Sequence, residues 1–219
     1  RIPAGERWDG IPAACVGRTA TPPVIDRHDE LSPAAYALTM ILAESALSLI
    51  KLLPLAAMTV AAAEMYGLSS DQIWSWMADP AASWTPVVVG LTMLVASVPL
   101  TLVLEVVLMR LLGRVRPGTI SVRSLAYVRV WLKTGILDTA GNWLSGTLFW
   151  PTWLRAAGMT IGARCEVSTI IDVVPELVTF GEDVFLADGI YLAGPRVQRG
   201  TVTLAATSLG DRTFLGNHV

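Results

Sequence analysis

The groups best suited to move a proton are a set of carboxylates in the last third of the chain and two histidines. The carboxylates are Asp172, Glu176, Asp183 and Asp188. A carboxylate can orient an attacking amine, and a base has to lie within about 3 Å of the proton that it removes, directly or through one water. Carboxylates are also common at the corners of repetitive strand structures, so a purely structural role stays open. His28 and His218 have equally plain alternatives, as a solvated linker residue and as a surface or packing residue.

These carboxylates lie in a segment, 158–219, that repeats every six residues. Pairs of an aliphatic or aromatic residue and a small residue recur at Ile161-Gly162, Phe180-Gly181, Leu186-Ala187, Leu192-Ala193, Leu209-Gly210 and Leu215-Gly216. In such a repeat the large side chain points into a narrow prism, and three units complete a triangular coil that packs on its neighbours. The pattern predicts the start of a left-handed parallel β-helix, with ordinary strands as the alternative. The step from Leu192 to Leu209 is one residue short of three units, which predicts a loop near 194–200.

The first residues carry the same kind of signal. Ile2 and Trp8 are six residues apart, and the run closes with GIPA at 10–13. We expect 1–14 to be the end of a preceding β-helix, and 15–44 to be a linker and the entry to a helix. Because the chain begins within the pattern and without an initiator Met, we expect it to be part of a longer protein.

Two strongly apolar stretches lie between these repeats. Residues 45–63 hold one charge, Lys51, and residues 85–104 hold none. About 20 apolar residues let a helix cross the hydrocarbon layer of a membrane. Lys51 can extend towards the nearer surface, and Pro54 should kink the first helix. We predict a transmembrane α-helical hairpin over 45–109 with an external linker at about 65–84; a buried hairpin in a soluble protein is the alternative.

The charges on either side of these spans differ in sign. The linker holds Asp71 and Asp79 but no Lys or Arg, whereas both flanks are basic. The positive-inside rule then predicts a multi-pass protein with both ends in the cytoplasm. The net charge of −2 provides no basic field, so we expect no nucleic-acid partner. Cys15 and Cys165 fit no metal or redox spacing, so we expect no metal site.

Residues 110–157 combine aromatic and basic side chains, namely Trp131, Trp143, Trp150 and Trp153 with Arg123, Arg129 and Lys133. A basic, Trp-rich amphipathic helix suits the cytoplasmic surface of a membrane. A helix packed on a soluble domain is the alternative, and the two are compatible. Gly141, Gly146 and Pro151 should break any long helix in this segment.

Five segments carry a family resemblance: PAGERWDGIPA (3–13), LLGRVRPG (111–118), GTLFWPTWLRAAGMTIG (146–162), PELVTFGEDVFLADG (175–189) and SLGDRTFLGNHV (208–219). They resemble the C-terminal membrane region of non-ribosomal peptide synthetases of the ε-poly-lysine synthetase type, the Pls/PosA family. The resemblance implies a bacterial-type plasma membrane location. It also implies an adenylation domain that activates an amino acid and a carrier domain that holds it as an aminoacyl thioester on phosphopantetheine. Tandem hexapeptide, acyltransferase-like domains would then form the peptide bonds.

This chain has no adenylation or carrier motif, so the resemblance makes those domains and the lipid membrane its partners, with no cofactor of its own. It points to Asp188, inside LADG, as the base, and His218 is the only imidazole of the repeat region. Arg155 of the WLR motif would steer a phosphate of the carrier arm, with Glu176 as a second contact. We expect activity only within a larger enzyme. A membrane-tethered hexapeptide acyltransferase acting on a sugar or lipid, and a non-catalytic membrane scaffold, remain the alternatives.

Overall fold

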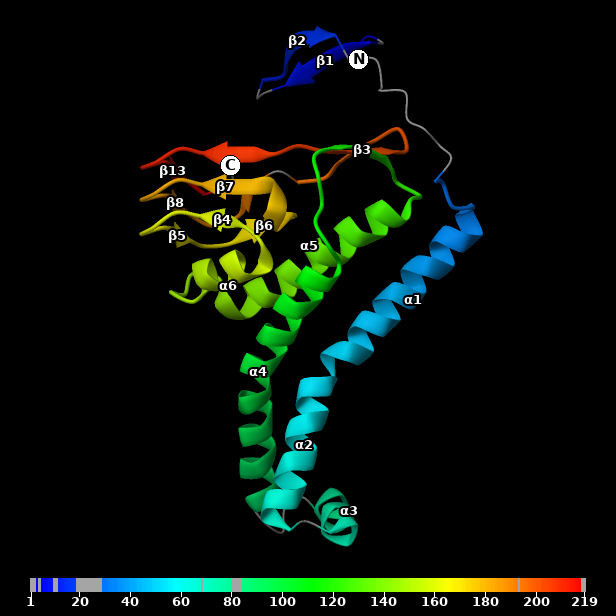
Figure 1. Cartoon of the computed structure of the whole chain (residues 1–219), viewed down its shortest axis with the longest axis vertical. Coiled ribbons are helices and arrows are strands. Elements are labelled where there is room, and N and C mark those ends of the chain that lie inside the picture. The colour runs from blue at the N-terminus through cyan, green and yellow to red at the C-terminus, as the bar shows by residue number, and fades with distance from the viewer. Residues whose placement is uncertain are drawn as a thin grey trace.

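The computed structural model describes residues 3, 5–9, 12–18, 29–67, 69–79, 84–192 and 194–217. Within them, Figure 1 shows a long helical hairpin that leads into a body of short strands and two further helices. The helices are α1 (Pro33–Lys51), α2 (Leu53–Tyr66), α3 (Ser70–Ala78), α4 (Thr85–Leu111), α5 (Leu125–Leu144) and α6 (Trp150–Ala157). The strands are β1 (Glu6–Asp9), β2 (Ala14–Arg18), β3 (Gly118–Ser121), β4 (Thr160–Ile161), β5 (Glu166–Val167), β6 (Ile170–Ile171), β7 (Val178–Phe180), β8 (Phe185–Leu186), β9 (Ile190–Tyr191), β10 (Arg196–Gln198), β11 (Thr201–Leu204), β12 (Thr207–Leu209) and β13 (Phe214–Leu215).

The first arm of the hairpin is formed by α1 and α2. Ser32 caps α1, since its hydroxyl accepts a hydrogen bond from the Ala35 N–H at 3.2 Å. The arm breaks at Leu52, beside Pro54, because proline cannot donate the hydrogen bond that would continue the helix. The kink predicted there is present. The helix begins at Pro33, well before the predicted span 45–63, because residues 33–44 are also mostly apolar and helix-forming.

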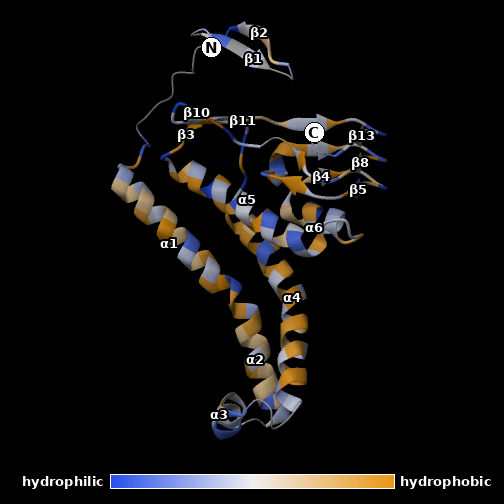
Figure 2. Cartoon of the chain, turned by 180° about the vertical axis from the view of Figure 1, so that it is seen from behind, coloured by the Kyte–Doolittle hydropathy of each residue, from blue (hydrophilic) through white to orange (hydrophobic). Residues whose placement is uncertain are grey.

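Two helices are long and apolar enough to cross a membrane: Pro33–Tyr66, which joins α1 and α2, and Thr85–Leu111, which is α4. Only 11% of the most apolar window of each is buried. Their apolar side chains therefore face outward along the arms, as Figure 2 shows in orange, and α2 packs along α4. The outward-facing apolar surface supports an association with membranes.

Apart from β10 and β11, the strands after α6 form three small parallel sheets, which the chain visits in the same order on each pass. The sheets are β4–β7–β12, β5–β8–β13 and β6–β9. Ile161 pairs with Phe180, which pairs with Leu209, and Val167, Leu186 and Leu215 align in the same way. Residues predicted to share a position in the repeat thus lie directly above one another. Phe180, Leu186 and Leu192 are buried, as the repeat predicted for side chains that point inward.

Gly162 shows why small residues follow the large ones. A Cβ atom at Gly162 would overlap the carbonyl oxygen of Gly181 on the next layer. The backbones of successive layers therefore approach more closely there than any side chain permits.

The repeat is interrupted where the spacing predicted a loop. Strands β10 and β11 form an antiparallel hairpin around the turn at Arg199 and Gly200. The hairpin is longer than the predicted 194–200 because β11 also pairs with β3, where Val202 lies opposite Ile120. This pairing attaches the segment that follows α4 to the parallel layers.

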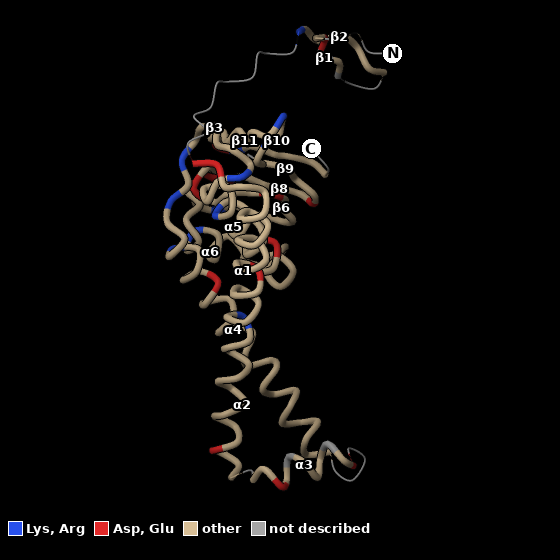
Figure 3. Tube along the Cα trace, turned by 90° about the vertical axis from the view of Figure 1, so that its right-hand side faces the viewer, with Lys and Arg blue, Asp and Glu red and all other residues tan. Residues whose placement is uncertain are grey.

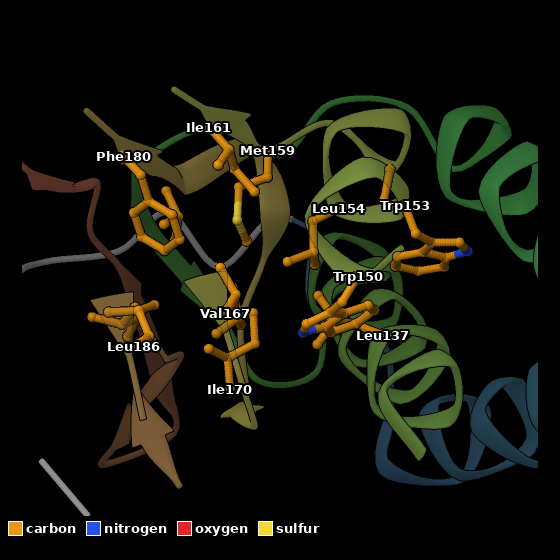
Figure 4. Close-up of a cluster of buried hydrophobic side chains, with 14 of the residues drawn as sticks. Leu137, Trp150, Trp153, Leu154, Met159, Ile161, Val167, Ile170, Phe180 and Leu186 are labelled. Carbon is orange, nitrogen blue, oxygen red and sulfur yellow. The ribbon is translucent and has the colours of Figure 1, made fainter. Parts of the chain in front are cut away.

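Helices α5 and α6 pack on the open end of these layers. Figure 4 shows Trp150 and Leu154 of α6 on the side that faces Val167 and other core side chains of the strands, whereas Trp153 lies on the opposite side of α6. The tryptophans, predicted to lie at a membrane surface, are instead buried and stacked with ring centroids 5.3 Å apart. Their N–H groups explain this position, since Trp150 donates to the Ser168 carbonyl at 3.1 Å and Trp153 to the Leu102 carbonyl at 3.0 Å.

The helix break expected within 110–157 is present between α5 and α6, where Gly146 has a φ of 71° and Pro151 lies in the first turn of α6. Gly141 takes no part in this break, because it lies within α5, where the ring of Trp150 would be 3.7 Å from an added Cβ. Lys133 is not at the surface, since it is fully buried in an ion pair. The segment is nevertheless helical, and Trp143, Leu148 and Phe149 remain exposed on α5 and the loop after it.

The described residues of 1–18 pair as an antiparallel hairpin and not as the parallel strands of the predicted coil end at 1–14. Strands β1 and β2 run antiparallel, with Glu6 opposite Arg18, so the hairpin extends beyond residue 14.

Candidate functional site

Asp188 lies in the turn between β8 and β9, where two hydroxyl groups donate to one of its carboxylate oxygens. Ser168 donates to Oδ1, and Thr169 donates to the same atom at 3.2 Å. The Asp188 N–H donates to Oδ1 of Asn217 at 3.1 Å. Each contact comes from the layer above or below, so the stacked strands hold the exposed carboxylate in place.

The end of α5 adds a third hydroxyl to this group. Ser145, the C-cap residue of α5, has its hydroxyl 3.1 Å from that of Thr169. The hydroxyls and the carboxylate therefore form one continuous polar group, Ser145–Thr169–Asp188–Ser168, where α5 meets the strands. We call it the hydroxyl–carboxylate cluster.

Two hollows lie on either side of this cluster. The larger, of about 420 Å³, is lined by Ser145, Thr169, Asp138 and Asn142 among others. The smaller, of about 340 Å³, is lined by Ser168 together with Thr147, Glu166 and Phe185. Since Ser168 and Thr169 are adjacent in sequence but line different hollows, Asp188 bonds to a wall residue of each.

Asp138 is the second carboxylate of this region, on the face of α5 that it shares with Asn142 and Ser145. The side chain of Asp138 is exposed, but its partial desolvation raises its pKa above the ordinary value, and the nearby Asp172 carboxylate raises it further because two like charges repel. A carboxylate with a raised pKa is a better proton acceptor near neutral pH than an ordinary one.

This arrangement can support proton removal from a nucleophile that enters the larger hollow. Asp138 provides a base with a raised pKa, and the hydroxyl groups of Ser145 and Thr169 provide hydrogen bonds that orient the nucleophile. Such geometry is suited to acyl transfer, in which an amine or hydroxyl loses a proton as it attacks a carbonyl carbon.

Arg155 lies apart from the cluster, at the end of α6. Its Nε donates to the Ile161 carbonyl at 2.9 Å, and one Nη donates to the Gly162 carbonyl. The guanidinium group therefore attaches α6 to the first layer of strands. It stays exposed, with N–H groups beyond these two bonds.

Glu176 is in a buried ion pair with Lys133 of α5. The side chain of Lys133 is 0% exposed and that of Glu176 is 7% exposed. Oε2 of Glu176 is buried without a hydrogen-bond partner in the described part of the chain. The structure thus places Glu176 between α5 and the strands, away from either hollow, and we assign it no contact with a substrate.

The remaining predicted residues do not join the cluster. Asp183 lies at a corner, where Nε of Arg164 contacts it at 2.6 Å, and this hydrogen bond lowers the pKa of Asp183. His28 and His218 lie outside the described residues. Across 29–67, 69–79, 84–192, 194–217 and the short described segments before them, no group of three or more His, Cys, Asp and Glu residues could hold a metal ion.

Asp138 is the site residue that sequence reasoning missed. The spacing of Asp138, Asn142 and Ser145 places polar residues on one face of a helix, and this signal is visible in the sequence. The aromatic and basic residues of the same segment directed attention to its surface instead. The partial desolvation of Asp138 and its proximity to Asp172 depend on the packing of α5 against the strands.

A comparison with curated proteins finds similarity to the Delta-poly-L-ornithine synthetase of Acinetobacter baumannii (strain AB307-0294). The two are 38% identical over 109 residues, which cover 48% of this chain and 8% of that protein. The chain thus corresponds to a small part of the relative's length. No protein-family model matches the sequence, and no solved structure matches it. The similarity supports the resemblance to Pls-type poly-amino-acid synthetases that the sequence motifs predicted.

Proposed function

We propose that this chain is the membrane-embedded, bond-forming part of a poly-amino-acid synthetase. The observation that carries this proposal is the 38% identity over 109 residues with a synthetase named for a polymer of ornithine. The outward-facing apolar hairpin supports a membrane location, and the cluster beside two hollows supports a chemical role. The adenylation and carrier domains that load the amino acid would belong to the same polypeptide.

The parallel layers are, in this proposal, the first coils of a left-handed β-helix of the hexapeptide acyltransferase type. The support is the recurrence of three sheets in the same order and the alignment of Ile161, Phe180 and Leu209 across layers. Each coil of such a helix buries its apolar residues against its neighbours, as the described layers do.

The reaction we propose is the attack of an amine on an aminoacyl thioester. The amine nitrogen bonds to the carbonyl carbon, the carbon–sulfur bond breaks, and the amine proton passes to Asp138 and then to the departing thiolate. Asp188 accepts the hydroxyl protons of Ser168 and Thr169, so the oxygen atoms of these hydroxyls are left to accept a hydrogen bond from the amine. The thioester arm of the carrier is a substrate that enters one hollow while the amine occupies the other. Arg155 keeps enough exposed N–H groups to contact the phosphate of that arm.

The test uses the full-length synthetase with Asp138→Asn or Asp188→Asn, and measures amino-acid loading and polymer formation separately. We expect normal loading in both variants. Loss of a general base costs a reaction about 10²-fold or more, and Asp138→Asn should slow polymer formation by that factor. Asp183→Asn is the matched control, because Asp183 is an exposed coil carboxylate outside the cluster.

Normal polymer formation by both Asp138→Asn and Asp188→Asn would reject the catalytic role. The chain would then be a membrane scaffold that spaces the other domains. Slow polymer formation by Asp183→Asn as well would show that any change to the coil disturbs the enzyme, and would equally reject a specific role for the cluster.

A further inference from the structure

A third hollow, of about 640 Å³, lies where the chain leaves α4. It is lined by residues 114–120, which lead from α4 to β3, by the first half of α5 and by Leu204 of β11. In Figure 1 this segment is the green trace that runs from the end of α4 to β3. Three arginines line the hollow, Arg114, Arg116 and Arg129, beside the buried side chains of Val115 and Val130.

These arginines differ from the others at this end of the hairpin. Arg110 donates from Nε to the Ala156 carbonyl at 2.7 Å, and Arg123 pairs with Glu30 at 2.7 Å. Within the part of the chain that the structure describes, Arg114, Arg116 and Arg129 have neither an ion pair nor a side-chain hydrogen bond. Three like charges around one hollow repel one another, so an anion that enters the hollow would be stabilised by all three.

The type of side chain favours a phosphate as that anion. A guanidinium group presents planar pairs of N–H donors that match two oxygens of a phosphate, and it stays charged at all physiological pH values. The volume lies within the range of small-ligand sites. The apolar side chains of Val115, Val130 and Leu204 give part of the wall no polar group, which suits a ligand with an apolar portion next to its phosphate.

The position of the hollow indicates where the phosphate comes from. Arg114 follows the last residue of α4, Leu111, by three residues, so it lies within about 11 Å of the end of that apolar helix. Basic residues that follow a membrane helix lie on the side where anionic headgroups are found, and basic pockets beside such helices bind these headgroups. Figure 3 shows that Lys and Arg gather around the body of strands and helices in the upper half, while the arms of the hairpin below are almost free of them.

We propose that Arg114, Arg116 and Arg129 form a binding site for a phosphate group, which the headgroup of an anionic phospholipid supplies. The site rests on the membrane location proposed above but not on the bond-forming role of the cluster. It would fix the body of strands at a defined height and orientation above the bilayer, because a bound headgroup links α5 and β3 to the lipid.

The experiment titrates short-chain phosphatidylglycerol, short-chain phosphatidylcholine or inorganic phosphate into the detergent-solubilised full-length protein and follows its thermal unfolding midpoint. We expect phosphatidylglycerol to raise the midpoint and phosphatidylcholine to do so far less. Each Arg→Gln change at Arg114, Arg116 or Arg129 should weaken the apparent affinity for phosphatidylglycerol about fivefold. The single variants carry the test if the triple variant does not fold.

The matched control removes the same charge from exposed positions outside the hollow, with Arg196→Gln, Arg199→Gln and Arg212→Gln combined. This control should bind phosphatidylglycerol as the unchanged protein does. Equal affinities of the hollow variants and the control would overturn the site. Equal stabilisation by inorganic phosphate and by phosphatidylglycerol would overturn the lipid as its source and leave a site for a free phosphate.

Flotation with phosphatidylcholine vesicles separates this proposal from the membrane location on which it rests. The triple variant should still float, because the apolar hairpin is unchanged. Failure of both the variant and the unchanged protein to float would reject the membrane location and the lipid site together. Loss of flotation in the variant alone would show that the arginines, and not the hairpin, hold the protein on the bilayer, which contradicts the proposed division of roles.

Discussion

The charge of Asp138 opposes folding at neutral pH. Partial desolvation and Asp172 raise the pKa of Asp138 above its ordinary value of 3.8, so the folded state prefers the protonated form. The contribution of Asp138 to stability is therefore most favourable at pH values below its ordinary pKa of 3.8. It is lost as the pH rises through the higher pKa that Asp138 has in the folded protein. We expect Asp138→Asn to increase the free energy of unfolding at pH 7 only slightly, because the side chain is exposed, and to leave it nearly unchanged at about pH 3, as denaturant titrations at the two pH values would measure.

Asp183→Asn should have the opposite effect to Asp138→Asn. The hydrogen bond from Arg164 lowers the pKa of Asp183, so the negative charge of Asp183 stabilises the folded state at pH values above its ordinary pKa of 3.8. Asp183→Asn should decrease stability at pH 7, although only slightly because the pair is exposed. If Asp138→Asn is less stable than the unchanged protein at pH 7, the carboxylate of Asp138 is not in a destabilising environment.

The Lys133–Glu176 pair predicts a different outcome, because each charge is buried and has the other as its counter-ion. Lys133→Met would leave the Glu176 carboxylate buried and unpaired, which costs about 3–5 kcal/mol. Lys133→Met combined with Glu176→Leu should recover most of that loss, because no isolated charge remains. A double-mutant cycle by denaturant unfolding measures both. If the double variant loses as much free energy of unfolding as Lys133→Met alone, the shape of the side chains, and not their charge, matters at this position.

At the scale of elements, the parallel layers depend on backbone contact at their glycines. Gly162→Ala would place a methyl group against the Gly181 carbonyl, which is backbone and cannot move aside without separating two layers. Gly210→Ala is the matched control, because its added Cβ would have no heavy atom within 4 Å. Overpacking of this kind costs about 1–3 kcal/mol. We expect thermal unfolding to show that loss for Gly162→Ala and little change for Gly210→Ala; equal stability of the two would contradict close contact between the layers.

The elements that sequence reasoning located well are those whose partners lie at a fixed spacing. Phe180 and Leu186 could be placed in the interior because a six-residue period gives each side chain the same direction in every layer. The break before Leu209 was located by the same count. The polar half of the site was partly located, since Asp188 lies in the repeat and belongs to the cluster.

The errors concern residues whose partners are distant in sequence. Lys133 pairs with Glu176, 43 residues away, and Trp153 donates to a carbonyl of α4, 51 residues away. Nothing near either residue indicates such a partner, and in isolation both side chains fit the composition of an interfacial helix. Asp138 was missed for the same reason, because its raised pKa arises from packing against the strands.

At the scale of the whole molecule, polar contacts join the hairpin to the body of strands. Trp153 of α6 bonds to the Leu102 carbonyl and Arg110 of α4 bonds to the Ala156 carbonyl. Lys51 does not extend to a surface as predicted but donates to Thr139 of α5 at 2.9 Å and lies 3.6 Å from Glu105 of α4. These contacts come from both arms, so a displacement of either arm in the bilayer would move α5 and α6, which form one wall of the two hollows beside the cluster.

The orientation of the molecule in a membrane follows from its charges. Between Lys51 and Arg110 the sequence holds no Lys or Arg, whereas basic residues occur on both flanks, so the tip of the hairpin should cross to the outside and the strands should stay in the cytoplasm. Cysteine labelling of intact cells tests this in a Cys15→Ser, Cys165→Ala background, which removes both native thiols. Ser70→Cys, exposed on α3 at the tip, should react with a membrane-impermeant maleimide. Ser208→Cys, exposed on β12, should react only after the cells are permeabilised. Labelling of Ser208→Cys in intact cells would place the strands outside the cell and contradict the predicted topology.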